Sequence, residues 1–173
     1  NPNILAMGDR PFCRRVLTNL LGAWDVNPAT SSAFIDGLLD YVDPDKKTTG
    51  NDDATENPNR VDGPLERLDE VEEIPGWAQV MQESREKDWR RKFTIYGSGK
   101  LSLKSADEDV IEAWLTLSPG GAANFIQTRR GQDGIDGTRD DIVNLGLLRP
   151  LSQEEQVRTQ AGNEDLWRVT STG

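Results

Sequence analysis

The sequence predicts a mainly α fold with a small β component, an α+β class. Apolar residues recur at helical spacing in several segments between residues 10 and 130, which is typical of helices that bury one face. Proline, glycine and capping residues stand at the ends of these segments. Strand-like composition or alternation is confined to short stretches at 93–96, 100–103 and 166–172.

Two helices are expected in the first part of the chain. Asp9 is placed to cap the first, and Pro11 falls in its first turn, where a missing N–H donor costs nothing. Asn27 caps the second helix, which begins at about Pro28. This helix ends at Asp43-Pro44, because proline disfavours a helical conformation in the residue before it.

The middle of the chain is expected to hold two helices and then two strands. A short helix in 62–77 ends at Pro75-Gly76, and a second runs from Trp77 to about Arg91. The part of the second helix from 85 to 92 is expected to be mostly solvated surface. Strands at 93–96 and 100–103 follow, with glycines between them.

Three more helices are expected in the rest of the chain. Capping-box patterns that begin at Ser105 and Ser152 open two of them. Ser118-Pro119 opens the other, which ends at Gly131.

We expect three regions. Residues 1–92 form a first helical subdomain with an acidic insert. Residues 93–131 form short strands and a second helical subdomain. Residues 132–173 form an acidic loop, a helix and a terminal strand.

Charge and composition limit the possible functions. The chain has 173 residues and a net charge of -10, which argues against a phosphate-binding surface and is compatible with divalent cations or a basic protein partner. Histidine is absent, which excludes histidine acid–base catalysis, Ser-His-Asp triads and ordinary zinc sites. Cys13 is the only cysteine, so no internal disulfide can form.

An acidic loop follows the second helix and is the first candidate metal site. Calcium takes about six to eight oxygen ligands, and aspartates spaced two apart can supply them. The EF-hand template does not fit, because Thr48 stands where that template requires glycine. A calcium loop of another kind and an acidic surface loop are both left open. The possible ligands are Asp43, Asp45, Asp52, Asp53 and Glu56.

A second acidic loop, rich in glycine, runs from Gly131 to Asp141. Its spacing of aspartate and glycine is that of a turn that folds around a cation, and ordinary turns also use these residues. It misses the EF-hand template, because Ile135 stands at the third position. Its candidate ligands are Asp133, Asp136, Asp140 and Asp141.

Two stretches, at 68–77 and 107–123, resemble parts of helix-hairpin-helix units, which often bind the DNA backbone through hairpin amides. Five acids between Glu66 and Glu73 would repel phosphate, so the charge disfavours a nucleic-acid-binding module. A carboxylate-based hydrolase is a further alternative, although nothing in the sequence singles out two acids.

Several motifs occur in a characteristic order along the chain: Tyr41-Val-Asp-Pro-Asp45, an acidic gap, Asn59-Arg-Val-Asp-Gly-Pro-Leu65, Leu68-Asp-Glu-Val-Glu-Glu-Ile-Pro-Gly76, and a segment from Phe93 to Ala106. In this order they resemble the general secretion pathway protein K family, the large minor pseudopilin of type II secretion. The resemblance spans about residues 33–130. The segment 100–105 departs from it, since the family has an asparagine-rich strand there.

The resemblance implies a fold, a role and a ligand. The fold would be two SAM-like helical subdomains inserted in a pseudopilin α/β scaffold. The role is structural and not enzymatic, at the tip of a periplasmic pseudopilus, in a protein anchored to the inner membrane by an N-terminal helix outside this sequence. The partners would be the minor pseudopilins designated I and J, and also secreted substrate proteins, with no nucleic acid. Calcium would bind in the acidic region, with Asp43, Asp45, Asp52 and Asp53 as candidate ligands and Glu56 next.

Overall fold

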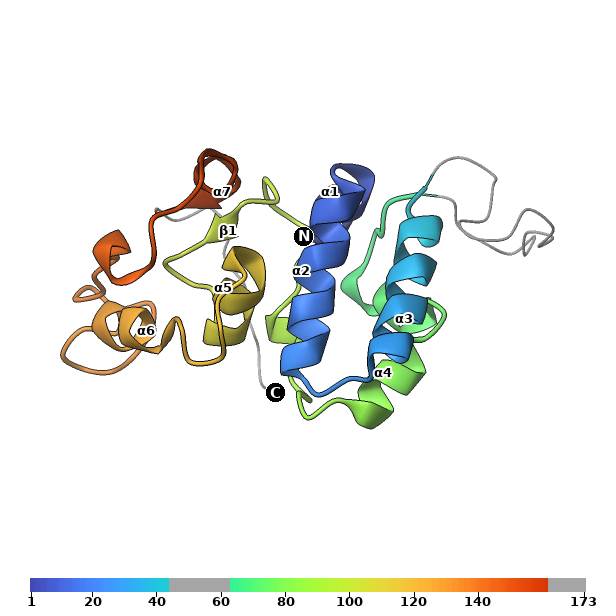
Figure 1. Cartoon of the computed structure of the whole chain (residues 1–173), viewed down its shortest axis with the longest axis horizontal. Coiled ribbons are helices and arrows are strands. Elements are labelled where there is room, and N and C mark those ends of the chain that lie inside the picture. The colour runs from blue at the N-terminus through green and yellow to red at the C-terminus, as the bar shows by residue number, and fades with distance from the viewer. Residues whose placement is uncertain (44–62, 162–173) are drawn as a thin grey trace, which may run out of the picture.

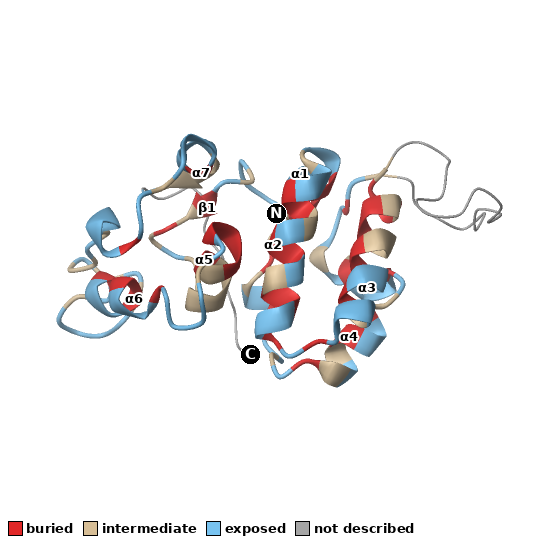
Figure 2. Cartoon of the chain, in the orientation of Figure 1, coloured by how far each residue is buried: buried red, intermediate tan, exposed pale blue. Residues whose placement is uncertain are grey.

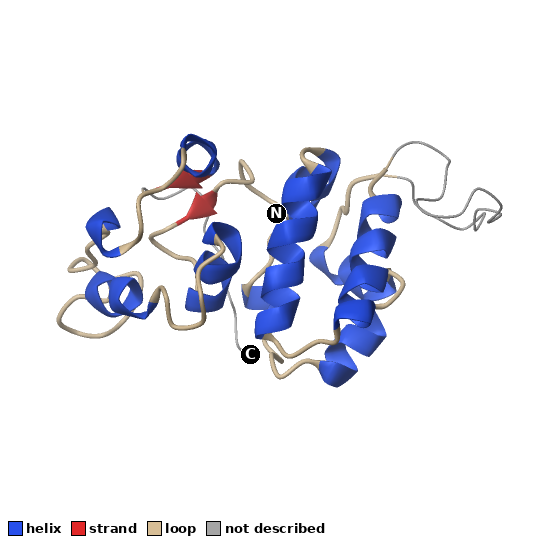
Figure 3. Ribbon diagram, viewed as in Figure 1, coloured by secondary structure: helices blue, strands red, loops and turns tan. Residues whose placement is uncertain are grey.

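The described part of the chain folds mainly into helices, with one small parallel sheet, and this confirms the predicted fold class (Figures 1 and 3). The computed structural model describes residues 1–43 and 63–161. The α-helices are α1 (Pro2–Met7), α2 (Arg10–Ala23), α3 (Pro28–Tyr41), α4 (Trp77–Glu83), α5 (Glu108–Leu115), α6 (Ala123–Arg129) and α7 (Gln153–Arg158). The 3-10 helices are η1 (Leu68–Glu73), η2 (Trp89–Arg91) and η3 (Leu145–Leu147). The sheet pairs β1 (Leu101–Ser102) with β2 (Thr159–Gln160).

Helices α2, α3 and α7 begin where the capping residues predict. The Asp9 carboxylate accepts a hydrogen bond from the Phe12 N–H at 2.9 Å, and the Asn27 side chain accepts one from the Ala29 N–H at 2.8 Å. Ser152 forms the predicted capping box with Glu155. Helix α1 was not predicted. The strand expected at 166–172 lies outside the described residues.

Some predicted boundaries are wrong. The helix expected in 62–77 is only the 3-10 helix η1. Asp107, not Ser105, is the N-cap of α5, and α6 begins at Ala123, four residues after the predicted proline start. The stretch 93–96 forms no strand, whereas the strand expected at 100–103 is present as β1.

The helix expected from Trp77 to Arg91 ends at Glu83. Ser84 is extended and buried, and its hydroxyl bonds to Glu86 at both the N–H (3.0 Å) and the carbonyl (3.1 Å). Such local side-chain bonds compete with the helical hydrogen bonds. The segment 85–92 is mostly exposed, as predicted, although Trp89 is buried. Lys92 is largely buried and pairs with Asp107 at 2.7 Å and with Asp109 at 3.0 Å.

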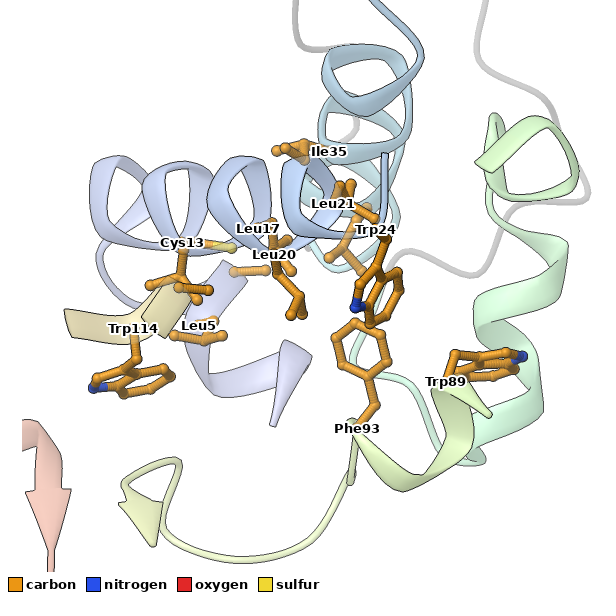
Figure 4. Close-up of a cluster of buried hydrophobic side chains, with 14 of the residues drawn as sticks. Leu5, Cys13, Leu17, Leu20, Leu21, Trp24, Ile35, Trp89, Phe93 and Trp114 are labelled. Atoms are coloured by element: carbon orange, nitrogen blue, oxygen red, sulfur yellow. The ribbon is translucent and has the colours of Figure 1, made fainter. Parts of the chain in front are cut away.

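Helix α2 lies at the centre of the molecule, between α3 on one side and α5 on the other (Figure 1). Its buried face is red in Figure 2, and Figure 4 shows Cys13, Leu17, Leu20 and Leu21 on it, with Leu5 of α1 close to Cys13. Burial raises the pKa of the Cys13 thiol to about 12, so the thiol stays protonated. Buried residues continue from α1 through α6 to Leu148, across the predicted regions. The region boundaries at 92/93 and 131/132 stay predictions.

Two glycines let helix α3 and the turn before α4 approach each other at the backbone. A Cβ at Gly37 would lie 2.9 Å from the Pro75 carbonyl oxygen. Gly76 has a φ of 89°, and a Cβ there would lie 3.0 Å from the Phe34 nitrogen. A side chain at either position would therefore push the turn away from α3, and Gly76 also holds a backbone conformation that other residues rarely adopt.

Among the helices of residues 1–43 and 63–161, none combines the length and the apolar character that crossing a membrane requires.

Candidate metal loops

The acidic insert after α3 is only partly described. Asp43, at its start, pairs with Arg10 of α2. The other candidate ligands of this loop, Asp45, Asp52, Asp53 and Glu56, lie outside the described residues. A cation that took the Asp43 carboxylate would therefore compete with the Arg10 guanidinium for it.

The two ends of the insert are held together at its base. The Gly63 N–H donates to the Tyr41 carbonyl at 3.2 Å, so the chain returns to the end of α3 after the insert. The buried side chain of Asn3 then bonds to both polar groups of the Leu65 backbone: its Oδ1 accepts from the N–H at 2.8 Å, and its Nδ2 donates to the carbonyl at 2.9 Å. Helices α1, α2 and α3 thus all contribute to this base.

In the second acidic loop, Gly131 to Asp141, three of the four aspartates bond mainly to the loop itself. Asp133 accepts from the Ile135 N–H at 2.8 Å, and Asp141 accepts from the Gly137 N–H at 2.7 Å. Asp140 accepts from the Thr138 hydroxyl at 2.6 Å and from the Gln132 N–H at 2.7 Å. These donors lower the pKa of Asp140 to about 2. The loop is therefore shaped by carboxylate-to-amide bonds, and Asp140 stays ionised at neutral pH.

The fourth aspartate of this loop, Asp136, bonds to two arginines. Its Oδ1 accepts from the Arg129 Nε at 2.9 Å and from the Arg129 Nη2 at 2.8 Å, and its Oδ2 accepts from the Arg130 Nε at 3.0 Å. Burial alone would raise the pKa of Asp136, but the two guanidinium groups outweigh it and hold the pKa below its usual value. A calcium ion that used Asp136 would have to displace both arginines.

Among the described residues, the predicted ligands do not come together as a finished site. Across residues 1–43 and 63–161, no three acidic or cysteine side chains form a group that could hold a metal ion. Calcium binding by either loop therefore stays a prediction.

The sequence reasoning missed the basic partners, Arg10, Arg129 and Arg130. For Arg129 a signal was present. Ala122, Phe125, Ile126 and Arg129 follow the spacing of one helical face, which places the arginine among the buried residues. A charged residue at a core position needs a partner of opposite charge, and the aspartates of the adjacent loop supply one.

An open groove of about 420 Å³ lies between α5, α6 and the second acidic loop. Glu108 and Arg130 lie on its lining. Burial and the neighbouring Glu112 carboxylate raise the pKa of Glu108. Glu108 and Glu112 are half-buried and stand one helical turn apart, as i and i+4. They lie at the start of the stretch 107–123, which resembles part of a helix-hairpin-helix unit. Phosphate would meet like charge there.

Comparisons of the chain with protein-family models, with curated proteins and with solved structures find no match.

Proposed function

We propose that the chain is the periplasmic part of a minor pseudopilin of the general secretion pathway protein K type, in a protein anchored to the inner membrane. It is a structural component at the tip of a type II secretion pseudopilus, and it has no catalytic activity. Its partners are the minor pseudopilins of the I and J types and, during export, secreted substrate proteins. It binds calcium in its acidic insert.

The order of motifs around the acidic insert carries this proposal. Tyr41-Val-Asp-Pro-Asp45 precedes the insert, and Gly63-Pro-Leu65 follows it. The bond between Tyr41 and Gly63 closes the base between these two motifs. A segment that leaves a helical domain and returns to the same point is what an insertion into that domain requires.

In this proposal the insert acts through its base. Arg10, Asn3 and the end of α3 connect it to the three helices that hold the N-terminal core. A cation in the insert would reduce repulsion among its carboxylates and order the chain next to these helices. The loop therefore stabilises a surface for assembly and does not act on a substrate.

Complex formation tests the role directly. We expect the chain to elute as one complex with the periplasmic domains of the I and J minor pseudopilins of the same organism, in the presence of calcium, during size-exclusion chromatography with light scattering. Separate elution of the three proteins at concentrations well above the micromolar range would contradict the proposal.

Calcium binding is expected to be measurable by calorimetric titration of metal-stripped protein. Because calcium binds the folded state, a free concentration of about 100 times Kd should raise the free energy of unfolding by about 2.7 kcal/mol. Absence of both heat and a shift in the melting temperature would rule out the calcium claim.

Paired variants assign the calcium to one loop. The double variant Asp52→Asn, Asp53→Asn removes two charges from the insert and should abolish binding. The matched variant Asp140→Asn, Asp141→Asn removes two charges from the second loop and should leave binding intact. The reverse pattern would place the ion in the loop from Gly131 to Asp141.

A further inference from the structure

A hollow of about 190 Å³ lies among three segments that are far apart in the sequence, and we call it the α1–α7 pocket. Helix α1, the turn at 98–100 and helix α7 surround it, and α2 and α5 also contribute side chains. The turn lies close to α1, because a Cβ at Gly99 would come within 2.5 Å of Ile4. The lining residues are Ile4, Leu5, Phe12, Ser98, Gly99, Lys100, Trp114, Val157 and Arg158.

The pocket is apolar inside and has apolar side chains exposed at its edge. Phe12 and Trp114 are buried and meet edge to face, with ring centroids 5.0 Å apart. Ile4 is 44% exposed and Val157 is 64% exposed, although both lie on the pocket. Exposed aliphatic side chains around a hollow of this size suit the insertion of one large apolar side chain.

The charges on the pocket are positive, on a chain whose net charge is -10. Its lining holds Lys100 and Arg158 and no acid. Arg158 is compensated, since it pairs with Asp9 at 2.9 Å and with Glu154 at 3.4 Å. Lys100 is exposed and makes no ion pair within residues 1–43 and 63–161. The remaining positive charge therefore favours an occupant that carries a carboxylate.

The indole of Trp114 forms part of the lining of the pocket. Its Nε1 is buried and donates to no acceptor within the described residues. Figure 4 shows this nitrogen on the side of the ring away from Leu5 and Cys13. The indole therefore serves as a reporter of binding on the lining of the pocket.

We propose that the α1–α7 pocket binds a segment of a partner protein that presents a large apolar side chain next to a carboxylate. The apolar side chain fills the hollow between Ile4, Trp114 and Val157. The carboxylate pairs with Lys100. The proposal does not depend on calcium or on the pseudopilin assignment, because it uses none of the residues of the two acidic loops.

The test uses the whole chain and the acetylated, amidated peptide Gly-Phe-Glu-Gly as the probe. Two control peptides replace either its Glu by Gln or its Phe by Ala. Binding is followed from the amide and indole N–H resonances of ¹⁵N-labelled protein, with the Trp114 indole signal identified by the Trp114→Phe variant. We expect the probe to shift the Trp114 indole and to bind about threefold more tightly than the Gln peptide, which is the usual effect of a partly exposed ion pair. The Ala peptide should not bind.

Three exposed positions supply matched variants that leave the core unchanged. Lys100→Gln should remove the difference between the Glu and Gln peptides. Val157→Ser should weaken both peptides, whereas Met7→Ser, at a side chain 56% exposed on α1 but off the pocket, should have no effect. Equal affinity for the Glu and Gln peptides, or shifts that avoid Trp114, would overturn the proposal. A concentration-dependent dimer that Val157→Ser abolishes would also overturn it, since a second copy would then be the occupant.

Discussion

Replacement of Arg129 by methionine is expected to lower the free energy of unfolding by about 3–5 kcal/mol, the usual cost of removing one partner of a buried charge pair. Arg129 is 0% exposed, and methionine is apolar and of similar length, so the loss is mainly of hydrogen bonds. Its Nη1 donates to the carbonyls of Leu103 at 3.0 Å and Ala106 at 2.6 Å, and its Nε and Nη2 donate to Asp136. The variant leaves these buried or partly buried acceptors without that donor.

The neighbouring arginine provides the matched control. Arg130 bonds to the other oxygen of Asp136 but is about half exposed, so Arg130→Met should cost less than about 1 kcal/mol. Urea denaturation of both variants, followed by circular dichroism, measures the difference. Losses of similar size would show that the carbonyl bonds of Arg129 contribute little, and that the shared aspartate alone explains both effects.

The ion pair of Arg129 with Asp136 also matters for the question whether the second acidic loop binds a metal ion. Asp136 is one of its four candidate ligands, and the structure assigns it to Arg129 and Arg130. If Asp136→Asn destabilises the protein about as much as Arg129→Met does, without changing calcium binding, the residue holds α6 and the loop together. The aspartate at position 136 is then explained by its ion pairs with Arg129 and Arg130 and not by metal binding.

The parts of the fold that could be predicted from sequence are those that local chemistry determines. Helices α2 and α3 have a capping side chain, a proline in the first turn and an apolar face at helical spacing, and these signals agree. Several of the failures lie between 84 and 96. There Ser84 ends α4 through its own hydroxyl, and the Arg85 N–H donates to the Trp24 carbonyl at 3.0 Å. A contact with a residue 61 positions away has no local signature.

The candidate sites likewise combine residues that have a local sequence signal with distant partners that have none. The sequence places the candidate acids in two loops, one that begins at Asp43-Pro44 and one that is rich in glycine. The partners of these acids, however, come from other elements. Arg10 reaches Asp43 from α2, and Asn3 reaches Leu65 from a helix that was not predicted. The α1–α7 pocket has no sequence signal, because its lining joins residues 4, 5, 12, 98–100, 114, 157 and 158.

Replacement of Trp77 by alanine is expected to cost about 3–5 kcal/mol, as for other buried aromatic residues that are cut back to alanine. Trp77 is 2% exposed, and its ring centroid lies 5.0 Å from that of Phe34, 4.8 Å from that of Trp89 and 6.4 Å from that of Phe93. It therefore joins α3, α4, η2 and the segment after η2. Trp77→Phe keeps an aromatic ring and most of the volume, so it should cost only about 1.5 kcal/mol.

Thermal unfolding of the two Trp77 variants measures this loss and also tests the predicted boundary between residues 92 and 93. A chain of this size loses about 2–4 °C in melting temperature per kcal/mol, so Trp77→Ala should melt about 6–20 °C lower. Phe93 lies beyond the boundary and contacts both Trp77 and Trp24, and α5 packs on α2. We therefore expect one cooperative transition, in which the amides of α5 lose hydrogen-exchange protection together with those of α3. Protection of α5 that survives the loss of α3 would show that residues 93–131 fold as a separate unit. The packing of α5 on α2 would then contribute little to the stability of either helix.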